Sequence, residues 1–208
     1  MQRRNASWRT LRFVVCVLAS IGGANAVSGQ VSAIGATVPT LSAVASWNVR
    51  ADSGVSAQAN TITLLVTSGG TQSITGLVDG AVNAFPAPVR VNTQWSTTQF
   101  IGTVDLVGYF TAPVAALSNG TTNLGSGLIE GRMTSGRVGA FTPFTQGPVA
   151  GQGVAGGTLH LFRQFVLFPF NHNGQRTDDL DLRLNLQGQP ALPPGTYSGT
   201  LTLRASVY

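Results

Sequence analysis

Few side chains in this chain are of the types that catalyse reactions or bind metals. The histidines are His160 and His172, and the single cysteine is Cys16. His160 stands among large apolar residues of an expected strand, and His172 lies in an Asn-His-Asn-Gly turn. The sequence has no zinc-binding His-Glu-x-x-His, no Gly-x-Ser-x-Gly and no phosphate-binding glycine loop. We therefore interpret both histidines as structural and predict no catalytic residues, no cofactor and no enzyme activity.

Three of the seven acidic residues, Asp178, Asp179 and Asp181, form a cluster just after Asn171 and Asn173. Oxygen ligands this close together can bind calcium, as in many extracellular β-domains. The spacing matches no calcium-loop signature, however. A charged outer face that discourages aggregation between sheet edges explains the cluster equally well, so both interpretations stay open.

Four aromatic residues admit a sugar-binding interpretation, because aromatic rings on a sheet can stack against a glycan. They are Trp47, Trp95, Tyr109 and Tyr197. Trp95 and Tyr197 share a face with apolar neighbours, which favours core positions for those two. A carbohydrate-binding module is thus a second functional hypothesis.

The first 26 residues have the layout of a secretory signal peptide. Basic residues precede an apolar run at 13–21, and Ala24 and Ala26 form a small-x-small cleavage site. The apolar run is much shorter than the roughly 20 residues that a membrane-spanning helix needs. We therefore expect export to the periplasm, cell surface or medium, with no membrane span after cleavage behind Ala26.

Removing this leader changes the electrostatic balance of the chain. All 12 basic residues are arginine, and four of them, at 3, 4, 9 and 12, leave with the leader, whereas all seven acids stay. The remaining 12 − 4 = 8 arginines against 7 acids give a net charge of about +1, and the eight are scattered. This balance disfavours a nucleic-acid partner.

The composition predicts an all-β fold. Lysine is absent, glutamate occurs once, and threonine, valine and glycine are abundant, which suits pleated surfaces better than helices. Once Cys16 leaves with the leader, the mature chain has no cysteine, so an apolar core must hold it together.

Alternation of apolar and polar residues marks the expected strands. The clearest lie at the C-terminal end, where every second residue from Leu180 to Leu186 is leucine and 197–207 alternates throughout. Further strands are expected at 61–67, 89–95, 100–110, 128–133 and 158–170. The segments 158–170 and 180–186 are expected to pair as a hairpin through the Asn173-Gly174 turn.

Short alternating strands without helical crossovers predict an antiparallel, immunoglobulin-like β-sandwich. We expect the signal peptide at 1–26, an extended arm or first strand at 27–40, and the sandwich at 41–208.

The C-terminal stretch 193–208 resembles the end of exported bacterial pilin-type subunits, which include chaperone–usher fimbrial subunits and the spore-coat-protein-U-like group. These families end in a Gly-x-Tyr strand followed by alternating apolar residues and a final aromatic. The matching positions are Gly195, Tyr197, Leu201, Leu203 and Val207.

This resemblance implies an incomplete sandwich whose groove accepts an extended strand from a chaperone or a neighbouring subunit. It points to a non-enzymatic structural protein of the cell surface, with residues 27–39 as the expected donor segment.

Overall fold

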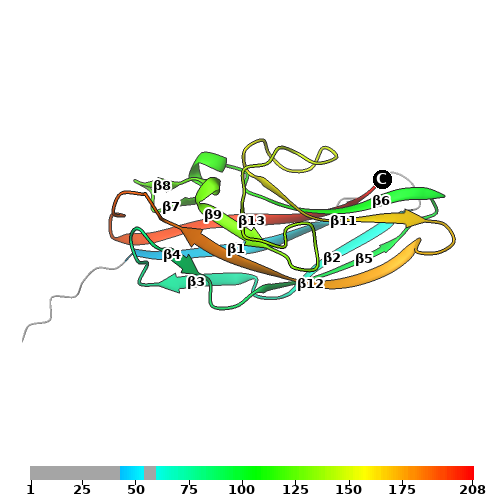
Figure 1. The fold of residues 1–208 in the computed structure, drawn as a ribbon, viewed down its shortest axis with the longest axis horizontal. Helices are drawn as coiled ribbons and strands as arrows, with labels where there is room; N and C mark the ends of the chain where they lie inside the picture. The colour runs from blue at the N-terminus through cyan, green and yellow to red at the C-terminus, as the bar shows by residue number, and fades with distance from the viewer. Residues whose placement is uncertain (1–42, 54–59) are drawn as a thin grey trace, which may run out of the picture. The chain divides into compact units, whose positions relative to one another are not determined.

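The computed structural model describes residues 43–53 and 60–208, and these residues form two β-sheets packed face to face. One sheet has the strand order β11-β6-β13-β1-β3, with the short β7 and β8 attached to β13. The other has the order β10-β9-β12-β5-β2, with β4 beside β12. Figure 1 shows the strands of both sheets. No α-helix occurs in the described residues, so the expected all-β sandwich is confirmed there.

The structure gives the element bounds as follows. The strands are β1 (Ala43–Ser53), β2 (Thr61–Ser68), β3 (Thr71–Thr75), β4 (Val82–Ala84), β5 (Val89–Ser96), β6 (Ile101–Tyr109), β7 (Leu117–Ser118), β8 (Asn123–Leu124), β9 (Ile129–Arg132), β10 (Thr142–Pro143), β11 (Thr158–Leu167), β12 (Asn173–Asn185) and β13 (Gly195–Val207). Two short 3₁₀ turns, η1 (Pro113–Ala115) and η2 (Ser126–Leu128), lie between strands.

Side chains alternate across the strands as the sequence pattern predicts. In β12, Leu180, Leu182 and Leu184 are buried while the residues between them are half-buried. β6 lies between β11 and β13 in its sheet, and it is buried on both faces from Val104 to Gly108. A single hydrophobic core fills the space between the two sheets. In the described part of the chain no helix is long and apolar enough to cross a membrane.

The expected hairpin between 158–170 and 180–186 is wrong. β11 pairs with β6 in one sheet, whereas β12 pairs with β5 and β9 in the other. The connection between them crosses from one sheet to the other. Both strands turn apolar side chains to the same core, and alternation alone cannot distinguish strands that pair from strands that face each other.

The prediction that all strands pair antiparallel is also wrong at one position. β1 runs parallel to β13, with Ala43 opposite Gly195 and Ser53 opposite Ala205. The same strand is antiparallel to β3 on its other side. The expected arm or first strand at 27–40 lies outside the described residues, and the first strand that the structure describes begins at Ala43.

Gly174 in β12 lies opposite Trp95 in β5, and the indole covers it. A Cβ atom at this position would lie 2.2 Å from Cζ2 of Trp95. We expect Gly174→Ala to displace the indole and to lower the free energy of unfolding by about 2 kcal/mol. Urea denaturation measures this change. Gly139→Ala is the control, because no atom lies within 4 Å of a Cβ there. Equal stabilities for the two variants would contradict this prediction.

Candidate functional site: the slot beside the C-terminal strand

The C-terminal strand β13 turns the predicted apolar residues into the core. Tyr197, Leu201 and Leu203 are fully buried, and Val207 is buried nearly as completely. The Tyr197 hydroxyl donates a hydrogen bond to the carbonyl oxygen of Pro193, 3.0 Å away. Gly195 opens the strand with φ of +145°, a conformation that side chains with a Cβ rarely adopt. The C-terminal ribbon is therefore an interior strand whose inward face belongs to the core.

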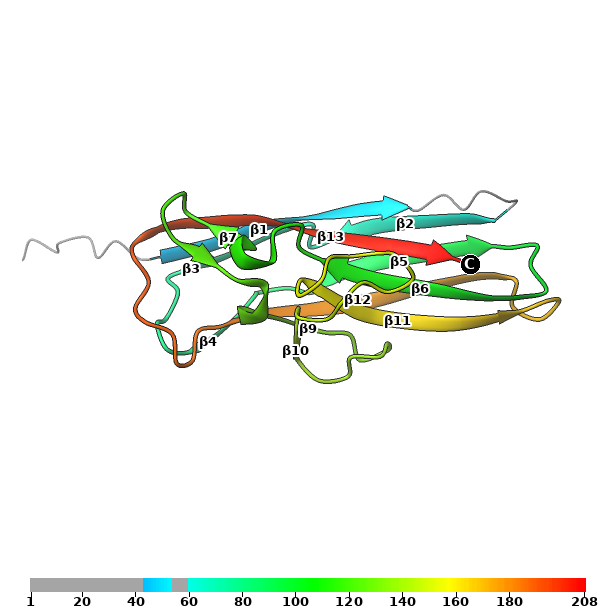
Figure 2. The ribbon, with the colours of Figure 1, turned by 90° about the horizontal axis from the view of Figure 1, so that it is seen from above.

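β1 occupies the space between β13 and β3, and we call this space the slot. Figure 2 shows β1 alongside β13. On the β13 side the two strands are paired over the whole length of β1, and on the β3 side the pairing covers 44–48. Ala43 and Ala45 of β1 are buried in the core. Without β1, the backbone edges of both β13 and β3 would lose their partner and the core would open along one side.

Only the stretch 54–60 links β1 to the next strand, β2. The end of this stretch is anchored by Asn60, which is buried directly before β2. Its Oδ1 atom accepts hydrogen bonds from the Thr97 hydroxyl at 2.6 Å and from the Thr98 amide at 3.2 Å. β1 is therefore tethered to the sandwich at the β5–β6 loop.

A buried carboxylate holds the end of β13. Asp105 of β6 is 1% exposed and accepts two hydrogen bonds of 2.8 Å from the guanidinium of Arg163. Its carboxylate also accepts a hydrogen bond from the hydroxyl of Tyr208, and Nε2 of His160 lies 3.0 Å from it. Tyr208 is bonded through its backbone to Thr103 as well. We call Asp105, His160, Arg163 and Tyr208 the Asp105 cluster.

Opposing effects act on the ionisation of this cluster. Burial raises the pKa of Asp105, but the hydrogen bonds from Arg163, His160 and Tyr208 outweigh it, so the pKa lies well below its usual range. Burial and the neighbouring carboxylate raise the pKa of Tyr208. The carboxylate of Asp105 therefore stays ionised and the phenol of Tyr208 stays protonated at neutral pH. These are the states in which the phenol can donate its hydrogen bond to the carboxylate.

Arginines neutralise the acidic residues that the sequence placed in one cluster. Asp178 pairs with Arg176, Asp179 with Arg90, and Asp181 with Arg132. Asp178 is buried on the leucine face of β12, and the other two lie on the outer face. Among the residues that the structure describes, no group of three His, Cys, Asp or Glu side chains is placed to hold a metal ion. The charged-face interpretation agrees with these contacts.

Each of the two histidines has a ring nitrogen within hydrogen-bonding distance of a neighbouring group. His160 belongs to the Asp105 cluster. Nδ1 of His172 lies 3.0 Å from the carbonyl oxygen of Pro169, and its ring contacts Phe168 with centroids 4.9 Å apart.

Among the aromatic side chains that the structure describes, Trp95, Tyr109 and Tyr197 do not form a shared stacking platform. Trp95 and Tyr197 are buried, Tyr109 is half-buried, and the side chain of Trp47 lies outside the described part. A shallow hollow of about 540 Å³ lies instead on the outer face of β2, β5 and β12. Trp95 and Gly174 line it together with uncharged amide and hydroxyl side chains, those of Thr61, Thr63, Gln94, Ser96, Asn173 and Gln175.

Sequence reasoning missed two parts of this site. β1 was not recognised as a strand, although 43–49 carries Val44, Trp47 and Val49 among small residues. The Asp105 cluster was signalled only by an aspartate inside an otherwise apolar strand. The predicted cleavage residues Ala24 and Ala26, and the predicted donor segment 27–39, lie outside the described residues.

No family model matches this chain, and no curated protein matches it.

Proposed function

We propose that this protein is an exported, non-enzymatic structural subunit whose copies assemble by strand exchange. In this proposal β1 of one copy leaves its own slot and fills the slot of another. The observation that carries it is the placement of β1, which is inserted between β13 and β3 and is joined to β2 by the stretch 54–60.

Strand exchange is favoured by what the slot offers to an incoming strand. β13 presents a backbone edge 13 residues long, and its inward face is lined by leucine, alanine and valine. Main-chain hydrogen bonds supply affinity in such pairing, and alternating side-chain sites supply register. A strand identical to β1 fits the slot from a second copy as it does from its own chain.

Apart from β3, whose ladder is formed with β1, the strands of the sandwich pair without any contribution from β1. β6 holds β13 on one side, and the whole sheet of β10, β9, β12, β5 and β2 is built without it. Removing β1 therefore breaks its ladders with β13 and β3 and leaves the pairing of the other strands intact. This modularity is what an exchangeable strand requires, and it agrees with the resemblance of 193–208 to pilin-type subunits.

The resemblance also brings a periplasmic chaperone into the proposal. A chain with an empty slot exposes an unpaired strand edge and apolar surface, which is an aggregation hazard. A chaperone strand that occupies the slot during export removes this hazard until another copy replaces it. The signal peptide at 1–26 supplies the route of export in this scheme.

A self-contained glycan-binding module is the second candidate function. It is favoured by the uncharged hollow on the outer face of β2, β5 and β12, whose amides and hydroxyls match the hydrogen-bonding groups of a neutral sugar. Such a module would keep β1 in its own slot.

A disulfide across the slot tests the proposal. Ser46 of β1 lies opposite Ser198 of β13, at a strand spacing compatible with a disulfide, and the leader-free chain has no other cysteine. We expect the oxidised Ser46→Cys/Ser198→Cys chain to stay monomeric at high concentration, because β1 cannot leave. The reduced form and the wild type should form oligomers, measured by size-exclusion chromatography with light scattering.

Each single-cysteine variant is the control and should assemble like the wild type. Oligomers that form equally well from the oxidised double variant would rule out exchange of β1. A wild-type chain that stays monomeric, and shifts in elution only with soluble polysaccharide, would favour the glycan-binding module instead.

A further inference from the structure

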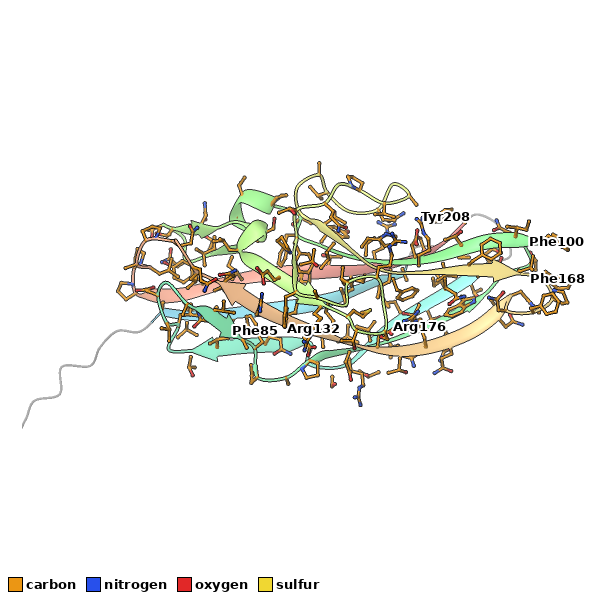
Figure 3. The ribbon with its side chains drawn as sticks, in the orientation of Figure 1. Phe85, Phe100, Arg132, Phe168, Arg176 and Tyr208 are labelled. Atoms are coloured by element: carbon orange, nitrogen blue, oxygen red, sulfur yellow. The ribbon has the colours of Figure 1, made fainter. Side chains whose placement is uncertain are left out.

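Large apolar side chains are exposed together at one end of the sandwich. Phe100 and Ile101 lie where β6 begins, and Phe165, Phe168 and Phe170 lie where β11 ends. We call these five residues the aromatic pole. Their exposed fractions range from 44% for Phe168 to 83% for Phe170. Figure 3 shows Phe100 and Phe168 next to each other at this end.

Backbone hydrogen bonds hold the segments that carry the aromatic pole next to one another. Ile101 pairs with Leu167 in the β6–β11 ladder, and the amide of Phe168 donates a 2.9 Å hydrogen bond to the carbonyl oxygen of Phe100. The Thr97 amide donates to the carbonyl oxygen of His172 at 2.9 Å, which joins the two loops that carry the pole. No charged residue occurs in 97–103 or 164–175. Contiguous exposed apolar surface of this kind marks interaction sites.

The tether of β1 begins at this same pole. Asn60 is hydrogen-bonded to Thr97 and Thr98, in the loop that leads into Phe100. From Asn60 back to Ser53 the chain has seven residue steps, which span at most about 25 Å when fully extended. A copy that receives β1 must therefore bring one end of its slot close to the aromatic pole of the donor. This holds for either direction in which the strand enters the receiving slot.

We infer that the aromatic pole packs against the copy that receives β1, so that each junction combines an exchanged strand with an apolar contact. This inference rests on the proposed function and adds the second surface of the junction. An uncharged pole suits this partner, because no like charges oppose the approach of two identical chains. Covering the exposed phenylalanines also supplies hydrophobic stabilisation that a single chain lacks.

Replacing the two most exposed phenylalanines tests the inference. Phe100→Ser/Phe170→Ser should leave folding unchanged, because both side chains are solvent-exposed in the single chain. We expect the concentration needed for half-maximal assembly of the leader-free chain to rise at least tenfold. Leu65→Ser is the control: Leu65 is 53% exposed on the outer face of β2, away from the pole, and its replacement should leave assembly unchanged.

Hydrogen exchange gives a second measurement that does not depend on the phenylalanine replacements. Amides of 97–103 and 164–173 should become protected when the wild type assembles, relative to the monomer of the oxidised Ser46→Cys/Ser198→Cys chain. Assembly of Phe100→Ser/Phe170→Ser at the wild-type concentration, without such protection, would overturn the inference and leave strand exchange intact. Failure of the wild type to assemble would overturn both.

Two further outcomes identify a different occupant. If the wild type binds zwitterionic phospholipid vesicles and the double variant does not, while both assemble equally, the pole contacts lipid. The same pattern with soluble polysaccharide in place of vesicles assigns the pole to a glycan. Either result contradicts a role at the junction between copies.

Discussion

Asp105→Asn is expected to lower the free energy of unfolding by about 2 kcal/mol, the effect typical of weakening the hydrogen bonds of a buried charged group. The replacement takes the charge from a carboxylate that is 1% exposed and that binds Arg163, His160 and Tyr208 together. Its loss leaves the guanidinium of Arg163 without this counter-ion and weakens the side-chain anchor of Tyr208. Urea denaturation followed by fluorescence measures the change.

The matched control for this variant is Asp179→Asn. Asp179 also forms an ion pair with an arginine, Arg90, but both side chains are about half exposed. Exposed pairs contribute little because water screens them, so we expect a change within about 0.5 kcal/mol. Similar effects of the two replacements would contradict a special role for the Asp105 cluster.

The Asp105 cluster also predicts that the free energy of unfolding depends on pH. The pKa of Asp105 is lower in the folded chain than in the unfolded chain, so its contribution to stability is fully present above the unfolded value, near 4. That contribution should be lost as the pH falls from about 4 toward the lower folded pKa. Asp105→Asn should lack this component, so the stability gap between wild type and variant should narrow on acidification. If the difference in stability between the wild type and Asp105→Asn stayed constant from neutral pH to pH 2, this prediction would be contradicted.

Ala45→Asp is expected to prevent β1 from occupying the slot. Ala45 is fully buried in the core beside Tyr197, and a carboxylate placed there without a partner costs at least about 3 kcal/mol. The sandwich should then expose the edges of β13 and β3. We expect limited proteolysis to remove the chain up to about residue 60, and we expect assembly of the leader-free chain to be lost.

Ser46→Asp is the control for this experiment. Successive residues of a strand point to opposite faces, and Ser46 is half-buried where Ala45 is fully buried. The added charge at residue 46 should therefore leave β1 in place. If Ala45→Asp were as resistant to proteolysis and assembled as well as Ser46→Asp, β1 would not be the strand that fills the slot.

Local pattern determined most of the strands of this protein. The leucines at 180, 182 and 184 lie on the core face of β12 as alternation predicts, because a period of two needs no knowledge of the neighbouring strands. Burial of Tyr197, Leu201, Leu203 and Val207 follows from the same rule. The strands β2, β5, β6 and β9 also lie close to their expected ranges. The lack of lysine and the abundance of threonine and valine were enough to predict sheets throughout.

Local pattern misled at the end of β11. The expected strand at 158–170 ends at Leu167, and Phe165, Phe168 and Phe170 are exposed rather than in the core. A register shift between His160 and Phe162 changes the phase of the alternation, so that Phe165 points outward. A bulge of this kind depends on the pairing partner β6 and is invisible in the spacing of the apolar residues.

The sequence by itself determined where most of the longer strands form and which face of them is apolar, because both depend on neighbours a few residues away. Only the tertiary structure decided that β11 and β12 belong to different sheets, that β1 enters the sheet parallel to β13, and that Asp105 meets Tyr208 across 103 residues. These features depend on contacts between distant segments, and any strand with one apolar face satisfies the same local pattern in several pairings. The slot is therefore a property of the assembled sheets and not of any one segment.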